Sequence, residues 1–384
     1  MTHTYITCPQ PQVGRHQPIQ KIKKLKPMSM ARLSEDLIVD VLTRLPVKPL
    51  MRFKCVSKQW CSLISAPQFA KTQLRRAREG NATSHQRIIK NGFLQTIHYE
   101  ALDDERDDDQ AVVQLHAPGT DPDQGFMLIG HCDGLMCLAC DEGYILYNPT
   151  TRQSRSLANS ESGPVTQDFV FHGFGYYPTI DDYKILQGKI VSCADGSKEA
   201  AMEIFALKSN SWRRIQNSRV IDPYDRGIYL NGALHWLVFP EIGSNRVRKI
   251  VSFDLAEEKF KEELSLPETD KTIEFEGLGI FGDRLFLYCG TWCDRLEAWI
   301  MNEYGKTESW TELFNVPTDG IPGAKYWTIP LCCTKNGKIV VDVDGREMVL
   351  FNPEDGTIKP YPVEDADYES AIYVESLVSP YVGA

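Results

Sequence analysis

The 384-residue sequence lacks any apolar run close to the ~18–20 residues that a transmembrane helix needs. No apolar core typical of a signal peptide precedes Leu33, and the cysteine count of eleven is odd, which does not suit a paired disulfide framework. Free thiols are typical of a reducing compartment, so we expect the cytoplasm and/or the nucleus. These absences argue against a membrane protein and against a secreted disulfide scaffold.

Clustered positive charge is also missing from most of the chain. Residues 1–80 hold 15 Lys and Arg against 4 Asp and Glu, whereas residues 81–384 hold 27 against 48. The larger part therefore has a formal net charge of −21, and it suits nucleic acid poorly because phosphate backbones bind grouped Lys and Arg. The first part, with a net charge of +11, suits an acidic partner instead.

Signatures of catalysis, metals and cofactors are weak. Residues 277–282 have the spacing GxGxxG, but a strand-like segment follows them and offers no helix N-terminus to a pyrophosphate. Cys137-x-x-Cys140 has no second pair at zinc-site spacing, so we expect these thiols on a buried strand. The eight histidines are scattered and form no recognisable catalytic arrangement. We predict no cofactor, no metal site and no catalytic residue.

The N-terminal part divides into a leader and a helical segment. Residues 1–30 are predicted to be a disordered leader, because four prolines interrupt a polar stretch; its lysines are either a nuclear-import signal or a solvated tail. From Leu33 the apolar residues follow a helical period, with Ser34 as a possible cap and with Pro46 and Pro49 separating two helices. Three short helices bury too little surface to be stable alone, so they should pack on another part of the chain.

Beyond residue 92 the pattern changes to alternating strands with glycine turns. The turn glycines at 134, 232, 282 and 337 are 98, 50 and 55 residues apart, and the first interval is twice 49. A period near 50 residues with about four strands predicts the blades of a β-propeller. The absence of Trp-Asp and Gly-Gly dipeptides disfavours WD40 and strict kelch repeats, and a two-sheet sandwich remains the alternative.

Strand-like segments remain outside the five complete repeats of residues 127–363. They comprise residues 93–102 and 111–115 before the repeats and residues 371–378 after them, where Ile372, Val374 and Leu377 are apolar. A propeller has open edges unless its ends are joined. We therefore predict six blades, with the last blade shared by both ends of the domain.

Residues 33–69 resemble an F-box. The matching features are Leu33 followed by acids at 35 and 36, Leu45-Pro46-Val47, Leu50, Arg52, Cys55-Val56-Ser57-Lys58, Trp60, Leu63-Ile64, Pro67 and Phe69; Ser34 stands where the family usually has proline. The later segments DGLMCLACDEGYILYNPTTRQSRSL, HGFGYYPTIDDYKIL, NGALHWLV and YVESLVSP resemble the F-box-associated domain of plant F-box proteins of the S-locus-type and F-box/kelch group. The predicted domains are an F-box at 31–78, a linker at 79–92 and a propeller at 93–384.

This resemblance implies a non-catalytic substrate receptor of an SCF-type cullin-RING ubiquitin ligase. The F-box would bind a Skp-type adaptor, and through it the cullin and RING subunits, while the propeller would hold a target protein. The implied adaptor-binding residues are Leu33, Leu37, Ile38, Leu45, Pro46, Val47, Leu50, Arg52, Val56, Lys58 and Trp60.

Residues that bind the target cannot be assigned from the sequence. Irregular segments at 221–227, 239–246 and 318–326 are candidates, because they combine length with Pro, Gly and charged residues. Two alternatives to the receptor stay open: a scaffold that binds the adaptor without promoting ubiquitination, and a propeller enzyme.

Overall fold

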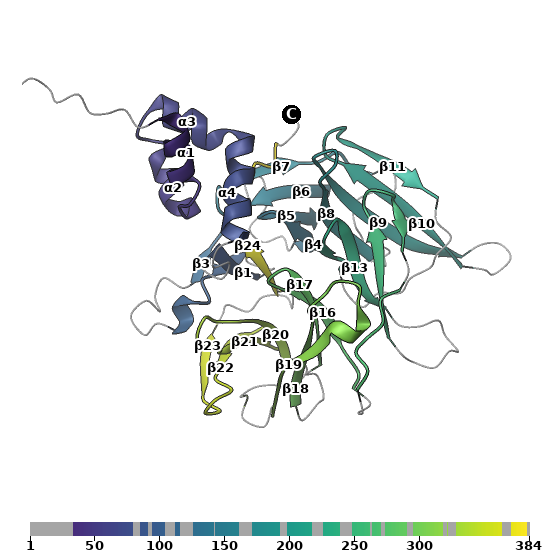
Figure 1. The fold of residues 1–384 in the computed structure, drawn as a ribbon. Coiled ribbons are helices and arrows are strands. Elements are labelled where there is room, and N and C mark those ends of the chain that lie inside the picture. The colour runs from purple at the N-terminus through teal and green to yellow at the C-terminus, as the bar shows by residue number, and fades with distance from the viewer. Residues whose placement is uncertain are drawn as a thin grey trace, which may run out of the picture.

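The computed structural model describes residues 34–79, 85–90, 94–103, 112–115, 126–141, 143–160, 171–192, 198–216, 226–238, 248–261, 263–269, 273–289, 295–317, 321, 328–362 and 370–381. The predicted leader, residues 1–30, and Leu33 lie outside these ranges. Figure 1 shows a group of helices at one edge of a ring of six small sheets. None of the helices in the described ranges is long and apolar enough to span a membrane.

Four helices form what we call the helical unit, residues 34–79. They are α1 (Glu35–Leu42), α2 (Val47–Phe53), α3 (Lys58–Ser65) and α4 (Pro67–Glu79). The hydroxyls of Ser34 and Ser57 accept hydrogen bonds from backbone amides one turn on, and so cap α1 and α3 as expected for serine. The sequence predicted three short helices; the structure has four, because residues 54–57 separate α2 from α3 and Ser57 is extended (φ −159°, ψ 161°) before α3 begins.

The six sheets are the blades of a β-propeller, each with four antiparallel strands. In chain order, blade 1 holds β4 (Met127–Cys132), β5 (Leu135–Cys140), β6 (Gly143–Asn148) and β7 (Gln153–Ser156), and blade 2 holds β8 (Phe171–Tyr177), β9 (Asp182–Ser192), β10 (Lys198–Ala206) and β11 (Ser211–Ile215). Blade 3 holds β12 (Ile228–Leu230), β13 (Ala233–Val238), β14 (Lys249–Asp254) and β15 (Lys259–Phe260), and blade 4 holds β16 (Gly277–Phe281), β17 (Arg284–Cys289), β18 (Arg295–Met301) and β19 (Trp310–Pro317). Blade 5 holds β20 (Thr328–Cys333), β21 (Ile339–Val343), β22 (Glu347–Phe351) and β23 (Ile358–Pro362). Blade 6 holds β24 (Ser370–Val374), β1 (Gln86–Lys90), β2 (Gln95–Ile97) and β3 (Val112–Gln114).

The first strand of each blade lies at the centre of the ring. Strands β4, β8 and β12 contact one another, β12 contacts β16, and β20 contacts β24. Tight hairpins follow β4 and β12, where Asp133-Gly134 and Asn231-Gly232 have positive φ at both positions. Two consecutive positive φ angles are typical of type I′ turns, which explains the Asp-Gly and Asn-Gly pairs in the sequence.

Blade 6 closes the ring with strands from both ends of the domain. Strand β24 pairs antiparallel with β1 over five residues, from Gln86 opposite Val374 to Lys90 opposite Ser370. This confirms the six-bladed fold with a shared last blade. The predicted linker, residues 79–92, is corrected, because β1 lies within it and the propeller therefore begins before residue 93.

The chain after β24 departs from the prediction at Leu377. This side chain leaves blade 6 and packs, with Val378, in an apolar core that also contains residues of the helical unit. The side-chain amide of Asn148 on β6 fixes the segment by donating to the carbonyls of Ser376 (3.2 Å) and Val378 (2.7 Å). The C-terminal segment therefore connects the closing blade to the helices.

A buried ion pair joins blade 6 to blade 5. The Lys90 ammonium on β1 lies 3.5 Å from the Asp342 carboxylate on β21, with both side chains almost inaccessible, and it donates to the Gly345 carbonyl at 2.6 Å. The Ser370 hydroxyl donates to the same carboxylate. Removing one member of such a pair leaves a buried charge without compensation.

We predict that Lys90→Met lowers the free energy of unfolding by about 3–5 kcal/mol, the usual cost of breaking a buried pair. The double variant Lys90→Met/Asp342→Leu should regain most of that loss, because it removes both charges. Urea unfolding of the three proteins measures the difference. Equal stability of the single and double variants would contradict a role for this pair in ring closure.

Candidate functional site

The helical unit shares one hydrophobic core with the propeller. Buried side chains of the helices, among them Leu42, Leu50 and Leu74, belong to the same cluster as Leu135 of blade 1 and Leu377 near the C-terminus. The sequence predicted that the helices would need another part of the chain, and the structure confirms this. Helix α4 lies between the three shorter helices and the blades (Figure 1).

On one side, α4 holds the shorter helices by polar contacts. The Arg76 guanidinium donates to the Asp40 carboxylate (2.7 Å) and to the Asp40 backbone carbonyl (2.8 Å). The buried Gln73 amide donates to the carbonyl of Leu45 (3.3 Å), which has no helical partner because α1 has ended. These contacts fix α1 and the following turn against α4.

On the other side, α4 is joined to blades 1 and 2 by two ion pairs. Lys71 pairs with Asp181 in the turn after β8, and Arg78 pairs with Asp133 in the hairpin after β4 (2.7 Å). The second Asp133 carboxylate oxygen accepts the Tyr183 hydroxyl at 2.8 Å. The sequence reasoning missed all four charged residues, because their partners lie 55 and 110 positions away in the chain.

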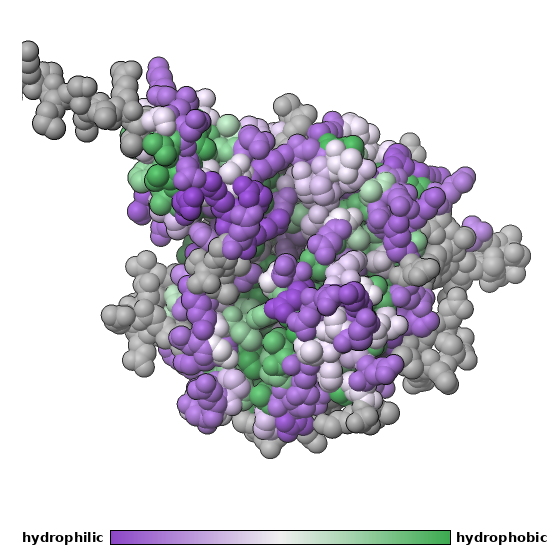
Figure 2. Space-filling model, in the orientation of Figure 1, coloured by the Kyte–Doolittle hydropathy of each residue, from purple (hydrophilic) through white to green (hydrophobic). Residues whose placement is uncertain are grey.

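The helical unit exposes large apolar side chains to solvent. Leu37 (54% exposed) and Val41 (58%) lie one turn apart on α1, and Val56 (61%) lies between α2 and α3. They are three of the eight large exposed hydrophobic residues in the described ranges, although the unit is only a small part of the chain. Figure 2 shows hydrophobic atoms gathered on the helices at the upper left. We call Leu37, Val41 and Val56 the apolar patch.

The predicted adaptor-binding residues fall into distinct environments. Leu37, Pro46 and Val56 are exposed, as are the cations Arg52 and Lys58; Ile38, Leu45 and Trp60 are half-buried; Leu33 lies outside the described residues. Val47 and Leu50 are both 0% exposed and belong to the shared core. This corrects the prediction for these two side chains, which support the surface from below and do not form it.

Val41 was missing from the predicted set. It follows Leu37 by four positions, the spacing that places two residues on one face of a helix, and this signal could have found it. Helix α1 carries apolar residues on two sides. Leu42 is buried at 3% exposure in the shared core, whereas Leu37 and Val41 point outward. Because the apolar side chains of α1 extend over more of its circumference than the shared core covers, some of them remain exposed.

The candidate target-binding segments lie largely outside the described residues. Only Arg226 and Gly227 of the segment 221–227, and Ile321 of the segment 318–326, are described. Cys137 lies buried on β5 as predicted, and burial raises the pKa of its thiol. In the described ranges, no three His, Cys, Asp or Glu side chains are grouped as metal ligands would be.

Helices with an outward apolar patch, fixed to the side of a six-bladed propeller, define an F-box protein with a propeller domain. Comparison with family models supports this class: the F-box domain matches residues 30–72 and the F-box associated beta propeller domain matches residues 101–382. The chain belongs to the family of F-box proteins that carry this propeller domain. Proteins of this class are typically non-catalytic adaptors.

The curated relatives are plant F-box proteins that align over most of their length. F-box protein CPR1 of Arabidopsis thaliana is 27% identical over 380 residues, covering 91% of this chain and 89% of that protein. The F-box/kelch-repeat protein At3g23880 of the same plant is 27% identical over 361 residues, covering 90% and 95%. F-box protein At4g19940 is 29% identical over 344 residues, covering 83% and 81%.

The ion pair between α4 and blade 2 predicts a pH dependence. Burial raises the pKa of the Asp181 carboxyl, but the hydrogen bonds from Lys71 and Tyr176 lower it more, so the net pKa lies below its usual value. A carboxyl with a lowered folded pKa stabilises the fold above its unfolded pKa of about 3.9, and the stabilisation is lost as the pH falls through the folded pKa.

We predict that Asp181→Asn lowers the thermal midpoint at pH 7, and that the difference from the wild type shrinks below about pH 4. Thermal unfolding over a pH series measures this. The control is Asp283→Asn, since Asp283 is an exposed carboxylate (side chain 97% exposed) in the β16–β17 hairpin. A difference that stays constant with pH would show that the Asp181 charge does not stabilise the junction.

Proposed function

We propose that the chain is the substrate-recognition subunit of an SCF-type cullin-RING ubiquitin ligase. The helical unit binds a Skp-type adaptor, and through it the cullin and RING subunits, and the propeller holds a target protein. The observation that carries the proposal is the apolar patch on a unit whose other side is buried against the propeller. The family assignment supports the same role.

The patch has the properties of a protein interface. An apolar side chain that becomes fully buried contributes about 1.5–3 kcal/mol, so three such residues give a binding surface of useful strength. The exposed cations Arg52 and Lys58 lie on the same helical unit and suit an acidic adaptor. Charges at the rim of an interface mainly set the association rate and the register.

In this proposal, the propeller positions the target protein. Ubiquitin transfer needs the target to be held close to the reactive centre, and proximity alone accounts for a large part of a rate enhancement. The shared core and the two ion pairs of α4 fix the propeller relative to the adaptor-binding helices. We propose that this rigid connection presents the bound target to the ubiquitin-charged enzyme, with the chemistry performed by other subunits.

We predict that Leu37→Asp weakens binding to a recombinant plant Skp-type adaptor about 30-fold or more, because a charged side chain replaces an apolar anchor worth about 2 kcal/mol. Val41→Asp should act in the same way. Ile180→Asp is the matched control, since Ile180 is exposed to a similar degree (47%) on the propeller. Calorimetric titration of the four purified full-length proteins measures the dissociation constants.

All four proteins should unfold at similar temperatures, because both patch residues are already exposed in the free protein. Adaptor binding by Leu37→Asp and Val41→Asp at wild-type strength would overturn the proposed role of the patch.

A ubiquitination assay distinguishes a substrate receptor from a scaffold that only binds the adaptor. Proteins captured by the full-length chain in plant cells treated with a cullin-ligase inhibitor supply candidate targets. The reconstituted ligase should ubiquitinate a captured target, and the Leu37→Asp chain should not support the reaction. Adaptor binding without ubiquitination of any captured protein would favour the scaffold. A fluorescent fusion tests the proposed location in the cytoplasm and/or nucleus.

A further inference from the structure

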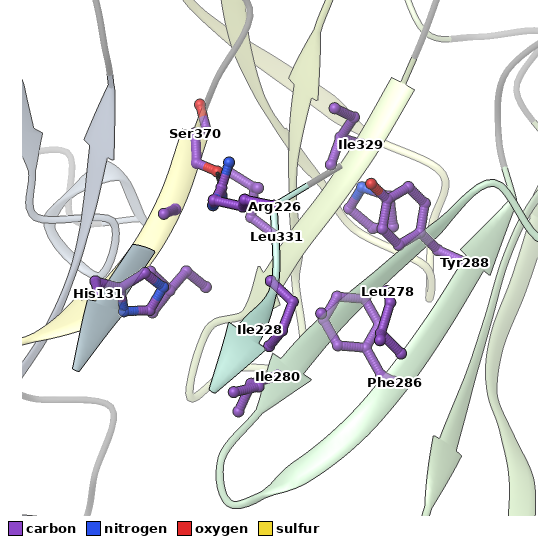
Figure 3. A pocket seen from close by; sticks show the side chains of 14 residues that line it. His131, Arg226, Ile228, Leu278, Ile280, Phe286, Tyr288, Ile329, Leu331 and Ser370 are labelled. Carbon is purple, nitrogen blue, oxygen red and sulfur yellow. Dashed lines mark hydrogen bonds between the residues drawn. The ribbon is translucent and has the colours of Figure 1, made fainter. Parts of the chain in front are cut away.

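The centre of the propeller contains a cavity of about 100 Å³. Its walls come from five of the six blades, with His131 on β4, Ile228 on β12, Phe286 on β17, Ile329 on β20 and Ile372 on β24 (Figure 3). One water needs about 10–15 Å³ of such volume, so the cavity has room for several waters or for one small ring.

One wall of the cavity is aromatic. Phe286 on β17 lies directly opposite Gly279 on β16, and both residues line the cavity. Tyr288 lies opposite Gly277 in the same way. A Cβ atom on either glycine would overlap with the facing ring, so glycine is what allows the two rings to lie across β16. The first two glycines of the GxGxxG spacing therefore have a structural role in building this wall.

His131 is a polar group on the opposite side of the cavity (Figure 3). Burial, together with the positive charge of Arg226, lowers the pKa of the His131 imidazole to about 3, so the ring is neutral at pH 7. A neutral imidazole has one N–H that donates and one nitrogen that accepts. Neither ring nitrogen forms a hydrogen bond within the described residues, so a ligand in the cavity could satisfy them.

The charge at the cavity favours an uncharged ligand. The Arg226 guanidinium is engaged inside the protein, where it donates to the Ser370 carbonyl at the start of β24 (3.0 Å), and we treat it as part of the wall. Its positive charge disfavours a cation, and no Asp or Glu is among the fourteen described residues that line the cavity. An anion would have to give up its hydration against walls that are mostly apolar, which is costly.

We propose that the central cavity binds a phenol group, an uncharged aromatic ring with one hydroxyl. The hydroxyl donates to the unprotonated nitrogen of His131, and the ring packs against Phe286 and Ile228. Aromatic rings that pack on one another gain more than their buried area alone provides. An apolar ring that displaces loosely held water from such a wall also gains affinity.

Two sources supply a phenol group. One is a free phenolic molecule, and the other is a tyrosine side chain of a target protein. Binding of a target's tyrosine rests on the proposed function, whereas binding of the phenol group itself does not.

The test uses the full-length protein at pH 7 and four probes. Phenol is compared with toluene, which is similar in size but has no hydroxyl, and with benzoate, which is charged; N-acetyltyrosinamide represents a tyrosine side chain. The variants are His131→Phe, which removes the polar group, and Ile228→Phe, which adds volume to the wall. Ile180→Phe is the matched control, since Ile180 is exposed (47%) in the turn after β8. Titrations followed by NMR report dissociation constants and the ring signals of His131.

We expect phenol to bind with a dissociation constant on the order of 1 mM and to shift the His131 ring signals. Toluene should bind about fivefold more weakly, because it cannot form the hydrogen bond, and benzoate at least about tenfold more weakly, because its charge is buried. His131→Phe should remove the difference between phenol and toluene. Ile228→Phe should weaken phenol binding at least about tenfold, and Ile180→Phe should not change it.

The fourth probe separates the two sources. Binding of phenol without N-acetyltyrosinamide indicates a site for a free molecule, whereas binding of both indicates a site that also accepts a tyrosine side chain.

Equal binding of phenol and toluene, tighter binding of benzoate, no saturable binding of phenol, or phenol binding unaffected by Ile228→Phe would overturn the proposal. The comparison of phenol, toluene and benzoate on the wild-type protein needs no variant, so it remains decisive if a variant does not fold. Capture of the Skp-type adaptor is measured on the same proteins. Wild-type adaptor capture without phenol binding refutes only the cavity proposal, and phenol binding without adaptor capture refutes only the proposed function.

Discussion

The helical unit depends on a hydrophobic core that it cannot form alone. Its inward side chains join those of blade 1 and the C-terminal segment in one cluster, and α4 contacts both the short helices and the blades. Units of this size bury too little apolar surface to be stable by themselves. The orientation of the apolar patch is therefore a consequence of how α4 packs on the propeller.

The propeller has its own means of holding neighbouring blades together. The indole N–H of Trp212 on the outer strand of blade 2 donates to the Ala158 carbonyl (2.6 Å), just after blade 1. Trp310 on the outer strand of blade 4 donates in the same way to the Ser265 carbonyl (3.1 Å), just after blade 3. Each tryptophan satisfies its N–H while burying most of its ring, which suits it to the junction of two sheets. Blade 6, which β24 completes, contacts blade 5 through the Lys90–Asp342 pair and blade 1 through a shared apolar cluster.

The propeller could be predicted from the sequence because its signals are local and repeated. Glycine turns such as Asn231-Gly232 need positive φ, and their spacing of about 50 residues follows from four short strands per blade. The predicted start of the propeller domain at residue 93 was wrong, because β1 has only five residues. It is part of a sheet only because it pairs with β24, almost three hundred positions later in the chain. No local pattern encodes such a partner.

The candidate binding surface was predicted in part. The motif located the correct helices, but it did not separate Leu50, which is fully buried, from Leu37, which is exposed. The propeller packs against one side of each short helix, and this packing decides which apolar side chains are buried. The same holds for the ion pairs of α4 with Asp133 and Asp181, since each pair joins the helical unit to a blade of the propeller.

Hydrogen exchange of the full-length protein with and without the Skp-type adaptor tests most directly whether the outward helices are the binding surface. The account predicts that the adaptor slows exchange in α1 and in the segment from α2 to α3, which carry Leu37, Val41 and Val56. Exchange in α4 and in the propeller strands should stay unchanged, because these are already packed in the free protein. Slowed exchange confined to the propeller, or no change in residues 35–65, would contradict it.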